Sequence, residues 1–270
     1  MPEPITLAAL LGSLVGLVLG LTGAGGGILA VPALMLGLGM NLTDATPISL
    51  VAIGGAASLG ALDGLANGQV RYRAALFMAA LGMASAPLGV WLAHRLPQSL
   101  LVTIFCGVMA VIALRMLRPL SRGRVGEAAG HPGARNCALN PATGCFRWNI
   151  PCAVTLACMG AAAGLFTGLL GVGGGFLIVP ALRQFSDLTM AAAAATSLAV
   201  IALVSTSTVI GSLLHGGRIG PTGWAFIAAT GAGLLLARHF ARHIPDRLLQ
   251  RGFGWIVVLV AMVWLGQSLG

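Results

Sequence analysis

The chain has 270 residues, of which 57% are hydrophobic and only 8% charged, and its mean hydropathy is +0.96. A soluble globular fold cannot bury so much apolar side chain, so the composition predicts an integral membrane protein. The formal charge of +9 comes from 15 arginines and no lysine, set against six acids. The arginines cluster between apolar segments, where they record orientation, and no stripe of basic and aromatic residues predicts a nucleic-acid partner.

Long apolar runs that do not alternate in polarity predict an all-α polytopic membrane protein and argue against barrel strands. The runs cover residues 5–22, 28–39, 45–66, 74–93 and 98–117, then 152–170, 176–185, 190–214, 222–240 and 248–267. Glu3 precedes the first run where a signal peptide would have basic residues, so we expect a membrane segment there. Residues 118–148 are rich in Gly, Pro and Arg and predict a polar linker. We therefore divide the chain into a first transmembrane repeat (1–117), a linker (118–148) and a second repeat (149–270).

The two repeats share a glycine-rich turn. Residues 20–34 read GLTGAGGGILAVPAL, and residues 168–182, lying 148 positions later, match at 11 of 15 positions. Pro97 and Pro245 open the last segment of each half at matching positions, as expected for a residue tolerated in the first helical turn. Membrane proteins built from two related halves commonly place a substrate site where interrupted helices of the halves face each other. The duplication makes transport the leading hypothesis.

The short run after each glycine turn bears on the architecture. Residues 28–39 span roughly 18 Å as a helix, less than the roughly 30 Å hydrocarbon core, which favours a re-entrant hairpin. With one crossing at each turn the halves are parallel, and the arginines divide nine against six. With hairpins, the halves are inverted repeats of a hairpin and three transmembrane helices, and the division is thirteen against two, with Arg95 and Arg218 in the minority. Arginine bias favours the inverted arrangement in a bacterial inner membrane, with the linker cytoplasmic and both termini outside; eight and ten membrane segments both remain open.

The glycine loops are the predicted binding site. They comprise Gly23, Ala24, Gly25, Gly26 and Gly27 in the first half and Gly171, Val172, Gly173, Gly174 and Gly175 in the second. Each loop lets a ligand approach main-chain N–H groups and opens onto a helix start, at Ile28 or Phe176, that favours a small anion. Close helix packing is the alternative role of these glycines. Two copies with a downstream Val-Pro-Ala-Leu, containing the structural residues Pro32 and Pro180, favour binding.

Polar side chains after the loops extend the candidate site. The hydroxyl residues are Thr43, Thr46 and Ser49 in the first half and Thr196 and Ser197 in the second. Each can complete the hydrogen bonding of a ligand or bond to its own helix. Asp63 lies inside an apolar run and is a candidate for H⁺ or Na⁺ coupling, or a group that caps or pairs locally. His215, aligned with Asn67, can titrate near neutral pH or be merely solvated.

Other chemistry finds little support in the sequence. The five cysteines, an odd number without framework spacing, provide no evidence for structural disulfides, and Cys106 and Cys158 fall in apolar runs as expected packing residues. His131, Cys137 and Cys145 match no zinc spacing, and no nucleophile, base and orienting group can be placed together. We expect no metal, no cofactor and no enzymatic activity.

The doubled G-x-G-G-G-x-x-x-V-P-A-L signature, the length and the central linker resemble the sulfite exporter TauE/SafE family of membrane permeases over nearly the whole chain. The matched signature residues are Gly23, Gly25, Gly26, Gly27 and Pro32, then Gly171, Gly173, Gly174, Gly175 and Pro180. The resemblance implies transport of small anions, typically sulfite or organosulfonates, and specifies neither direction nor oligomeric state. The resulting hypothesis is a secondary transporter that holds an oxoanion between the loops. A passive anion channel, a permease for another small solute, and a membrane enzyme or sensory partner are the alternatives.

Overall fold

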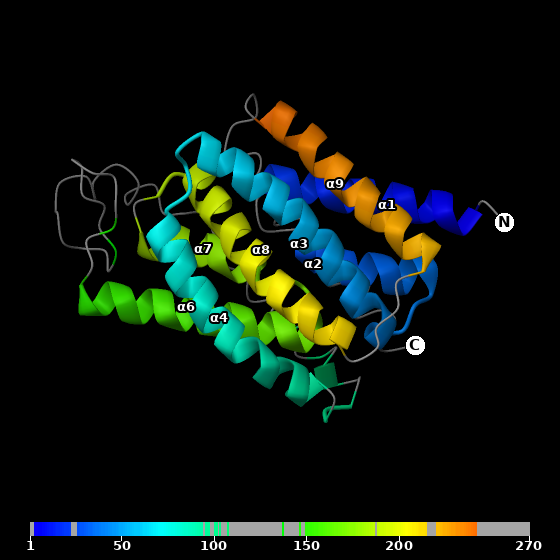
Figure 1. Cartoon of the computed structure of the whole chain (residues 1–270), viewed down its shortest axis with the longest axis horizontal. Coiled ribbons are helices and arrows are strands. Elements are labelled where there is room, and N and C mark those ends of the chain that lie inside the picture. The colour runs from blue at the N-terminus through cyan, green and yellow to red at the C-terminus, as the bar shows by residue number, and fades with distance from the viewer. Residues whose placement is uncertain are drawn as a thin grey trace.

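The structure is a computed structural model that describes residues 3–22, 26–93, 95–97, 149–186, 188–214 and 220–241, with residues 100, 101, 103, 107, 137 and 146. In this part of the chain every regular element is a helix (Figure 1). The elements are α1 (Glu3–Thr22), α2 (Gly26–Pro32), the π-helical η1 (Ala33–Gly37), α3 (Leu42–Ala66), α4 (Tyr72–Ala93), α6 (Ile150–Leu170), α7 (Gly175–Phe185), α8 (Met190–Leu214) and α9 (Pro221–Ala241).

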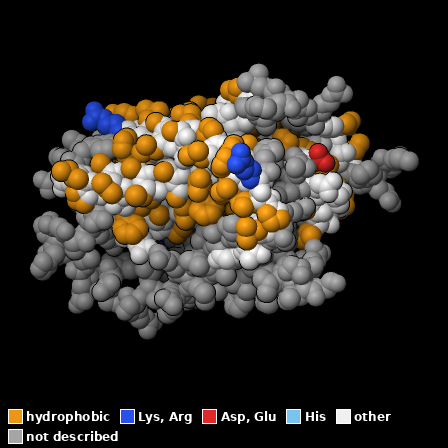
Figure 2. All heavy atoms as spheres, turned by 90° about the horizontal axis from the view of Figure 1, so that it is seen from below, with side chains coloured by type: hydrophobic (Ala, Val, Ile, Leu, Met, Phe, Trp, Pro, Cys, Tyr) orange, Lys and Arg blue, Asp and Glu red, His pale blue; other side chains and the backbone are white. Residues whose placement is uncertain are grey.

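The helices follow the apolar runs of the sequence. Five of those described are long and apolar enough to cross a membrane, and two shorter apolar helices cover Gly27–Gly37 and Gly175–Phe185. Leucines such as Leu10, Leu62 and Leu88 are more than half exposed, and Figure 2 shows a face dominated by apolar side chains. The prediction of an all-α polytopic membrane protein is confirmed. The run 248–267 and nearly all of 98–117 lie outside the described residues.

Helices of the two halves pack in equivalent pairs. α1 lies along α9, α6 lies along α4, and α3 crosses α8 in the centre (Figure 1). An offset of 148 residues takes α1 to α6, α3 to α8 and α4 to α9, so each outer pair joins a helix of one half to a helix of the other. The halves are therefore interleaved, and neither is packed as a separate bundle.

Small residues allow the outer pairs to approach closely. Glycines four residues apart face the partner helix in both pairs: Gly12, Gly16 and Gly20 on α1, and Gly160, Gly164 and Gly168 on α6. A Cβ on Gly16 would meet the carbonyl oxygen of Thr230, and a Cβ on Gly164 would meet that of Gly82. Helices in membranes use such stripes to bring their backbones together. Close packing is thus the role of these helical glycines.

The neighbours of the helical glycines also give the directions of the helices. Along α1, Gly12 lies beside Phe226 and Gly20 beside Ala237, so α1 and α9 run parallel. The centre differs, since Gly54 of α3 lies beside Ser205 of α8, whereas Gly64 lies beside Ala195. The equivalent helices α3 and α8 consequently run antiparallel.

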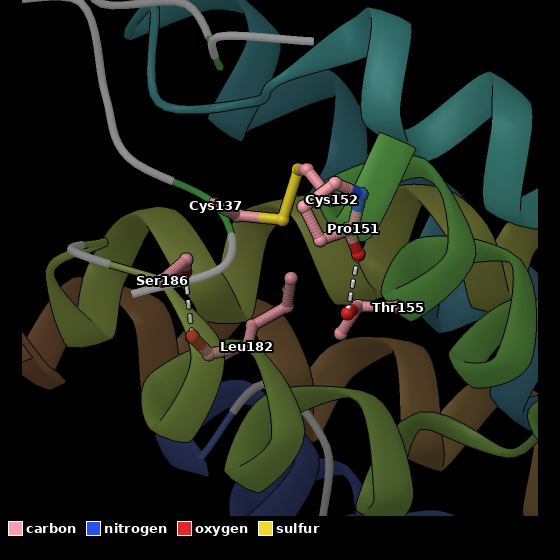
Figure 3. Close-up of a disulfide and its surroundings, with 6 residues drawn as sticks. All are labelled: Cys137, Pro151, Cys152, Thr155, Leu182 and Ser186. Carbon is pink, nitrogen blue, oxygen red and sulfur yellow. Dashed lines mark hydrogen bonds between the residues drawn. A yellow bond between two sulfur atoms is a disulfide. The ribbon is translucent and has the colours of Figure 1, made fainter. Parts of the chain in front are cut away.

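A disulfide joins the linker to the end of the bundle where α4 and α6 begin and α3 ends, which we call the linker end. The Cys137 and Cys152 sulfurs are 2.06 Å apart (Figure 3). The Cys137 N–H donates to the Phe185 carbonyl over 3.1 Å. The cysteine spacing did not indicate this disulfide, because spacing does not show that the linker returns to the start of α6. The packing role expected for Cys158 was wrong, since its side chain is exposed. Cys106 lies outside the described residues.

Candidate functional site

The second glycine loop has a conformation that side chains would oppose. Gly171 ends α6 with a φ of 67°, and Gly173 and Gly174 follow with φ of 76° and 61°. L-residues with a Cβ rarely adopt this left-handed region, so glycine is required here. Gly174 is the N-cap of α7 and, lacking a side chain, leaves the first turn of that helix without a side-chain cap. The Leu177 N–H of this turn donates to the Gly174 carbonyl over 3.1 Å, whereas the Gly175 and Phe176 amides come earlier in the turn and receive no side-chain cap.

The two loops meet beside the central helix crossing. A Cβ on Gly27 would meet the carbonyl oxygen of Val172, so the end of the first loop contacts the second. A Cβ on Gly173 would lie 3.1 Å from Ile53 of α3 and 3.3 Å from Ile201 of α8. Among the described residues, the start of α2 is thus in direct contact with the second loop. Gly23 and Gly25 lie outside the described residues, and Gly26 begins α2.

Two equivalent serines hold the carbonyl groups of the second loop. The Ser49 hydroxyl lies 2.9 Å from the Gly171 carbonyl, in the other half, and 2.8 Å from that of Thr46. The Ser197 hydroxyl lies 3.5 Å from the Gly175 carbonyl. A Cβ on Gly171 would lie 2.6 Å from the Thr46 methyl. Ser49, Ser197 and Thr46 are therefore at the loop, as neighbours of its backbone.

Thr196 lies elsewhere. Its hydroxyl donates to the Ala192 carbonyl over 2.7 Å and accepts from the Arg71 N–H over 3.2 Å, next to the connection between α3 and α4. Adjacent helical residues point about 100° apart, so Thr196 and Ser197 cannot both face the loop. The side chain of Thr43 and all of His131, Cys145 and His215 lie outside the described residues.

Ser205 was missed by the sequence analysis, which followed only the hydroxyls directly after each hairpin. It is fully buried, and its hydroxyl has no hydrogen-bond partner among the residues that the structure describes. Its Oγ lies 3.7 Å from the position that a Cβ on Gly173 would take. Ser197, Ile201 and Ser205 are spaced four residues apart and share a face of α8, which is the signal that could have found it.

Asp63 forms an ion pair between the halves. Its Oδ2 lies 3.1 Å from Nη1 of Arg238 on α9, which also donates to the Gly60 carbonyl, while Asn67 donates to Asp63 Oδ1 over 3.1 Å. The carboxylate is 43% exposed and Arg238 17%. Of the two roles left open for Asp63, pairing is observed. The ion-pair partner, Arg238, lies 175 residues away in the sequence, whereas the hydrogen-bond partner Asn67 is local.

Comparison with known proteins identifies the family. Residues 8–263 match the family described as Sulfite exporter TauE/SafE. Two relatives from Xylella fastidiosa, strains 9a5c and Temecula1 / ATCC 700964, are each named "Probable membrane transporter protein". They are 34% and 32% identical over 262 residues, which cover 95% of this chain and 93% of each relative. The chain belongs to the sulfite exporter TauE/SafE family. The resemblance is confirmed, and the protein is a membrane transporter of this family.

The remaining candidate residues of this TauE/SafE protein are those after each loop, Ile28 and Phe176, and the signature prolines Pro32 and Pro180. Ile28 and Phe176 are fully buried, and the Phe176 ring meets Phe166 edge-on at 6.4 Å. Their side chains belong to the core, so a ligand could reach them only through the main chain. Pro32 ends α2 where η1 begins, whereas Pro180 lies inside the continuous α7.

Proposed function

We propose that this protein is a secondary transporter that holds a small oxoanion, sulfite or an organosulfonate, between its two glycine loops and carries it without chemical change. The observation that carries the proposal is the contact of the loops, Gly27 against Val172, beside the central crossing of α3 and α8. Two related loops meeting at the interface of two halves are the arrangement in which such transporters bind substrate.

The polarity around the second loop suits an anion. α7 has 11 residues and an uncapped first turn, so its amides and partial positive charge face the loop. Ser49 and Ser197 engage loop carbonyls, which removes acceptor groups that would otherwise repel a negative charge. We assign binding to the backbone of Gly23, Gly25, Gly26, Gly27 and Ile28, and of Gly171, Gly173, Gly174, Gly175 and Phe176.

For the transport cycle, we propose inverted repeats, residues 1–117 and 149–270, and alternating access by rocking of the α1 and α9 pair against the α4 and α6 pair. The antiparallel course of the equivalent α3 and α8 supports the inversion. Interleaved outer pairs mean that rocking must move α1 with α9 and α4 with α6, because their backbones are in contact. Asp63 is the proposed coupling group for H⁺ or Na⁺, since the ion pair of Asp63 with Arg238 joins α3 to α9. His215 is the second candidate.

We propose a bacterial inner membrane with the linker on the cytoplasmic side. Arg71 and Arg73 begin α4, and Arg183 lies in the last turn of α7, all at the linker end, whereas Arg95 follows α4 at the opposite end. This bias supports a cytoplasmic linker. The Cys137–Cys152 disulfide lies at the same end and opposes it, because structural disulfides persist in oxidising compartments.

Thiol labelling in intact cells separates these two observations. An impermeant maleimide applied outside, with and without a reductant, should leave Cys137 and Cys152 unlabelled if the linker is cytoplasmic. Labelling that appears after an impermeant reductant would place the linker outside and reverse the proposed orientation.

Transport itself is tested in proteoliposomes. We expect uptake of sulfite or methanesulfonate to saturate with concentration and to depend on a proton or sodium gradient. Flux that never saturates and ignores both gradients would support a passive anion channel. In detergent, a bound anion should raise the unfolding temperature, because it stabilises the folded state only. An anion screen without any such rise, together with no flux, would refute the proposal.

A further inference from the structure

We infer that Ser205 donates a hydrogen bond to the bound oxoanion and places its charged group on the second-half loop; this inference rests on the proposed function. Ser205 is fully buried, and within the described part of the chain its hydroxyl has no hydrogen-bond partner. Burying a hydroxyl away from water is unfavourable unless it is hydrogen-bonded, so such groups call for a missing partner. A transported ligand would supply a hydrogen-bond acceptor to this hydroxyl while it is bound and leave the hydroxyl without one after release.

The helix around Ser205 does not satisfy its hydroxyl. Serine and threonine in helices usually donate to a carbonyl three or four residues earlier. The next two residues do so, Thr206 to Ala202 over 2.6 Å and Ser207 to Val204 over 2.8 Å. The Ser205 hydroxyl is therefore oriented away from its own helix backbone, in contrast to its neighbours.

Two glycines border the hydroxyl. Its Oγ lies 3.7 Å from the position of a Cβ on Gly173 and 3.8 Å from one on Gly54. Because both are glycines, neither contributes a side chain that covers the hydroxyl. The first turn of α7 begins two residues after Gly173, without a side-chain cap. An anion at this point would accept from the hydroxyl and from main-chain amides together, a combination of donors that binds charge well.

The position is not duplicated. Ser49 and Ser197 are equivalent and each bonds a carbonyl of the second loop, whereas the residue 148 positions before Ser205 is Ala57. Ala57 is fully buried and presents a methyl group. A site formed by two related loops is thereby made one-sided, with an extra donor in the second half only.

The test is a titration of the detergent-purified full-length protein with sulfite and methanesulfonate, followed by thermal unfolding. We expect Ser205→Ala to weaken anion binding roughly tenfold to a hundredfold, as for loss of a hydrogen bond to a charged group. Its unfolding temperature without anion should equal or exceed that of the wild type, because an unsatisfied hydroxyl has been removed. Ser207→Ala is the matched control, since it changes the same residue type on the same helix, and it should bind anions as the wild type does.

The outcomes separate this inference from the proposed function. Wild-type affinity in Ser205→Ala, alongside weakened binding in Gly173→Ala, overturns the role of Ser205 and leaves the loop site standing. A lower unfolding temperature of anion-free Ser205→Ala shows a structural partner and also overturns it. If the wild type responds to neither anion, this inference fails, and the proposed function fails with it when the proteoliposomes also show no flux. Ser205→Cys, with a weaker donor, should bind with intermediate affinity.

Discussion

The two halves of the chain share the residues that set distances between helices and differ in the residues that carry polarity. Gly16 and Gly164 occupy equivalent positions and meet equivalent carbonyls of the partner helices. The polar groups behave differently: Ser205 corresponds to Ala57, Asp63 to Gly211 and Arg238 to Val90. Outside the glycine loops and the Ser49 and Ser197 pair, duplicated positions therefore report the scaffold, and polar side chains present in one half only are candidates for selectivity and coupling.

The short helices after the loops show the same inequality. In the first half, α2 has seven residues and gives way at Pro32 to the π-helical η1, whereas α7 continues unbroken for 11 residues. The partial charge at a helix start comes from aligned peptide dipoles and is stronger in the longer regular helix. In the proposed site, the second half therefore supplies the helix start better suited to an anion.

The largest expected effect tests the shared scaffold. Gly16→Ala and Gly164→Ala each place a Cβ against a backbone carbonyl, which forces two helices apart. We expect each variant to lose about 3 kcal/mol or more of stability, at the upper end for overpacking. Thermal unfolding of the purified variants measures this.

Gly55→Ala is the control, because a Cβ on Gly55 meets nothing within 4 Å. It should be neutral or slightly stabilising, since alanine is favoured over glycine in a helix. If only one of Gly16→Ala and Gly164→Ala unfolds, the α1 and α9 pair and the α4 and α6 pair are not equivalent in packing, which contradicts the comparison of the two halves.

The scaffold was predictable because it depends on patterns repeated along the chain. Long apolar runs predict helices wherever they occur, and the matching turns at Gly20 and Gly168 predict two loops that face each other. The polar contacts were not predictable in the same way. Cys137 with Cys152, and Asp63 with Arg238, are single pairs brought together by tertiary packing, and no periodicity marks them.

A smaller effect tests the loop. Gly173→Ala introduces a side chain at a φ of 76°, and Gly39→Ala does so at 64°, where no atom lies within 4 Å of the added Cβ. Each substitution should cost about 1–2 kcal/mol of stability, the usual penalty for a left-handed L-residue. Because the backbone penalty is similar, the pair isolates the effect of position.

Only the Gly173 variant should lose sulfite or methanesulfonate binding, measured as the anion-induced rise in unfolding temperature. Gly174 is a poorer probe, since its Cβ would also lie 2.5 Å from the Ala163 carbonyl. Equal anion responses in Gly173→Ala and Gly39→Ala would remove the second loop from the site.

The smallest expected effect concerns the ion pair that exists in one half of the comparison only. Because Asp63 is 43% exposed, Asp63→Asn should cost about 0.5–1 kcal/mol of stability, the range for accessible pairs. Arg238→Gln should cost more, about 1–2 kcal/mol, because the Gly60 carbonyl loses its donor as well. The double variant should lose less stability than the two single losses added together, since each single change already breaks the ion pair.

The ion pair also bears on coupling. A Na⁺ or H⁺ gradient should drive less uptake in Asp63→Asn than in wild type, although the variant is nearly as stable. If uptake by Asp63→Asn depends on the gradient as fully as in wild type, the ion pair only holds α3 and α9 together, and His215 is left as the coupling candidate.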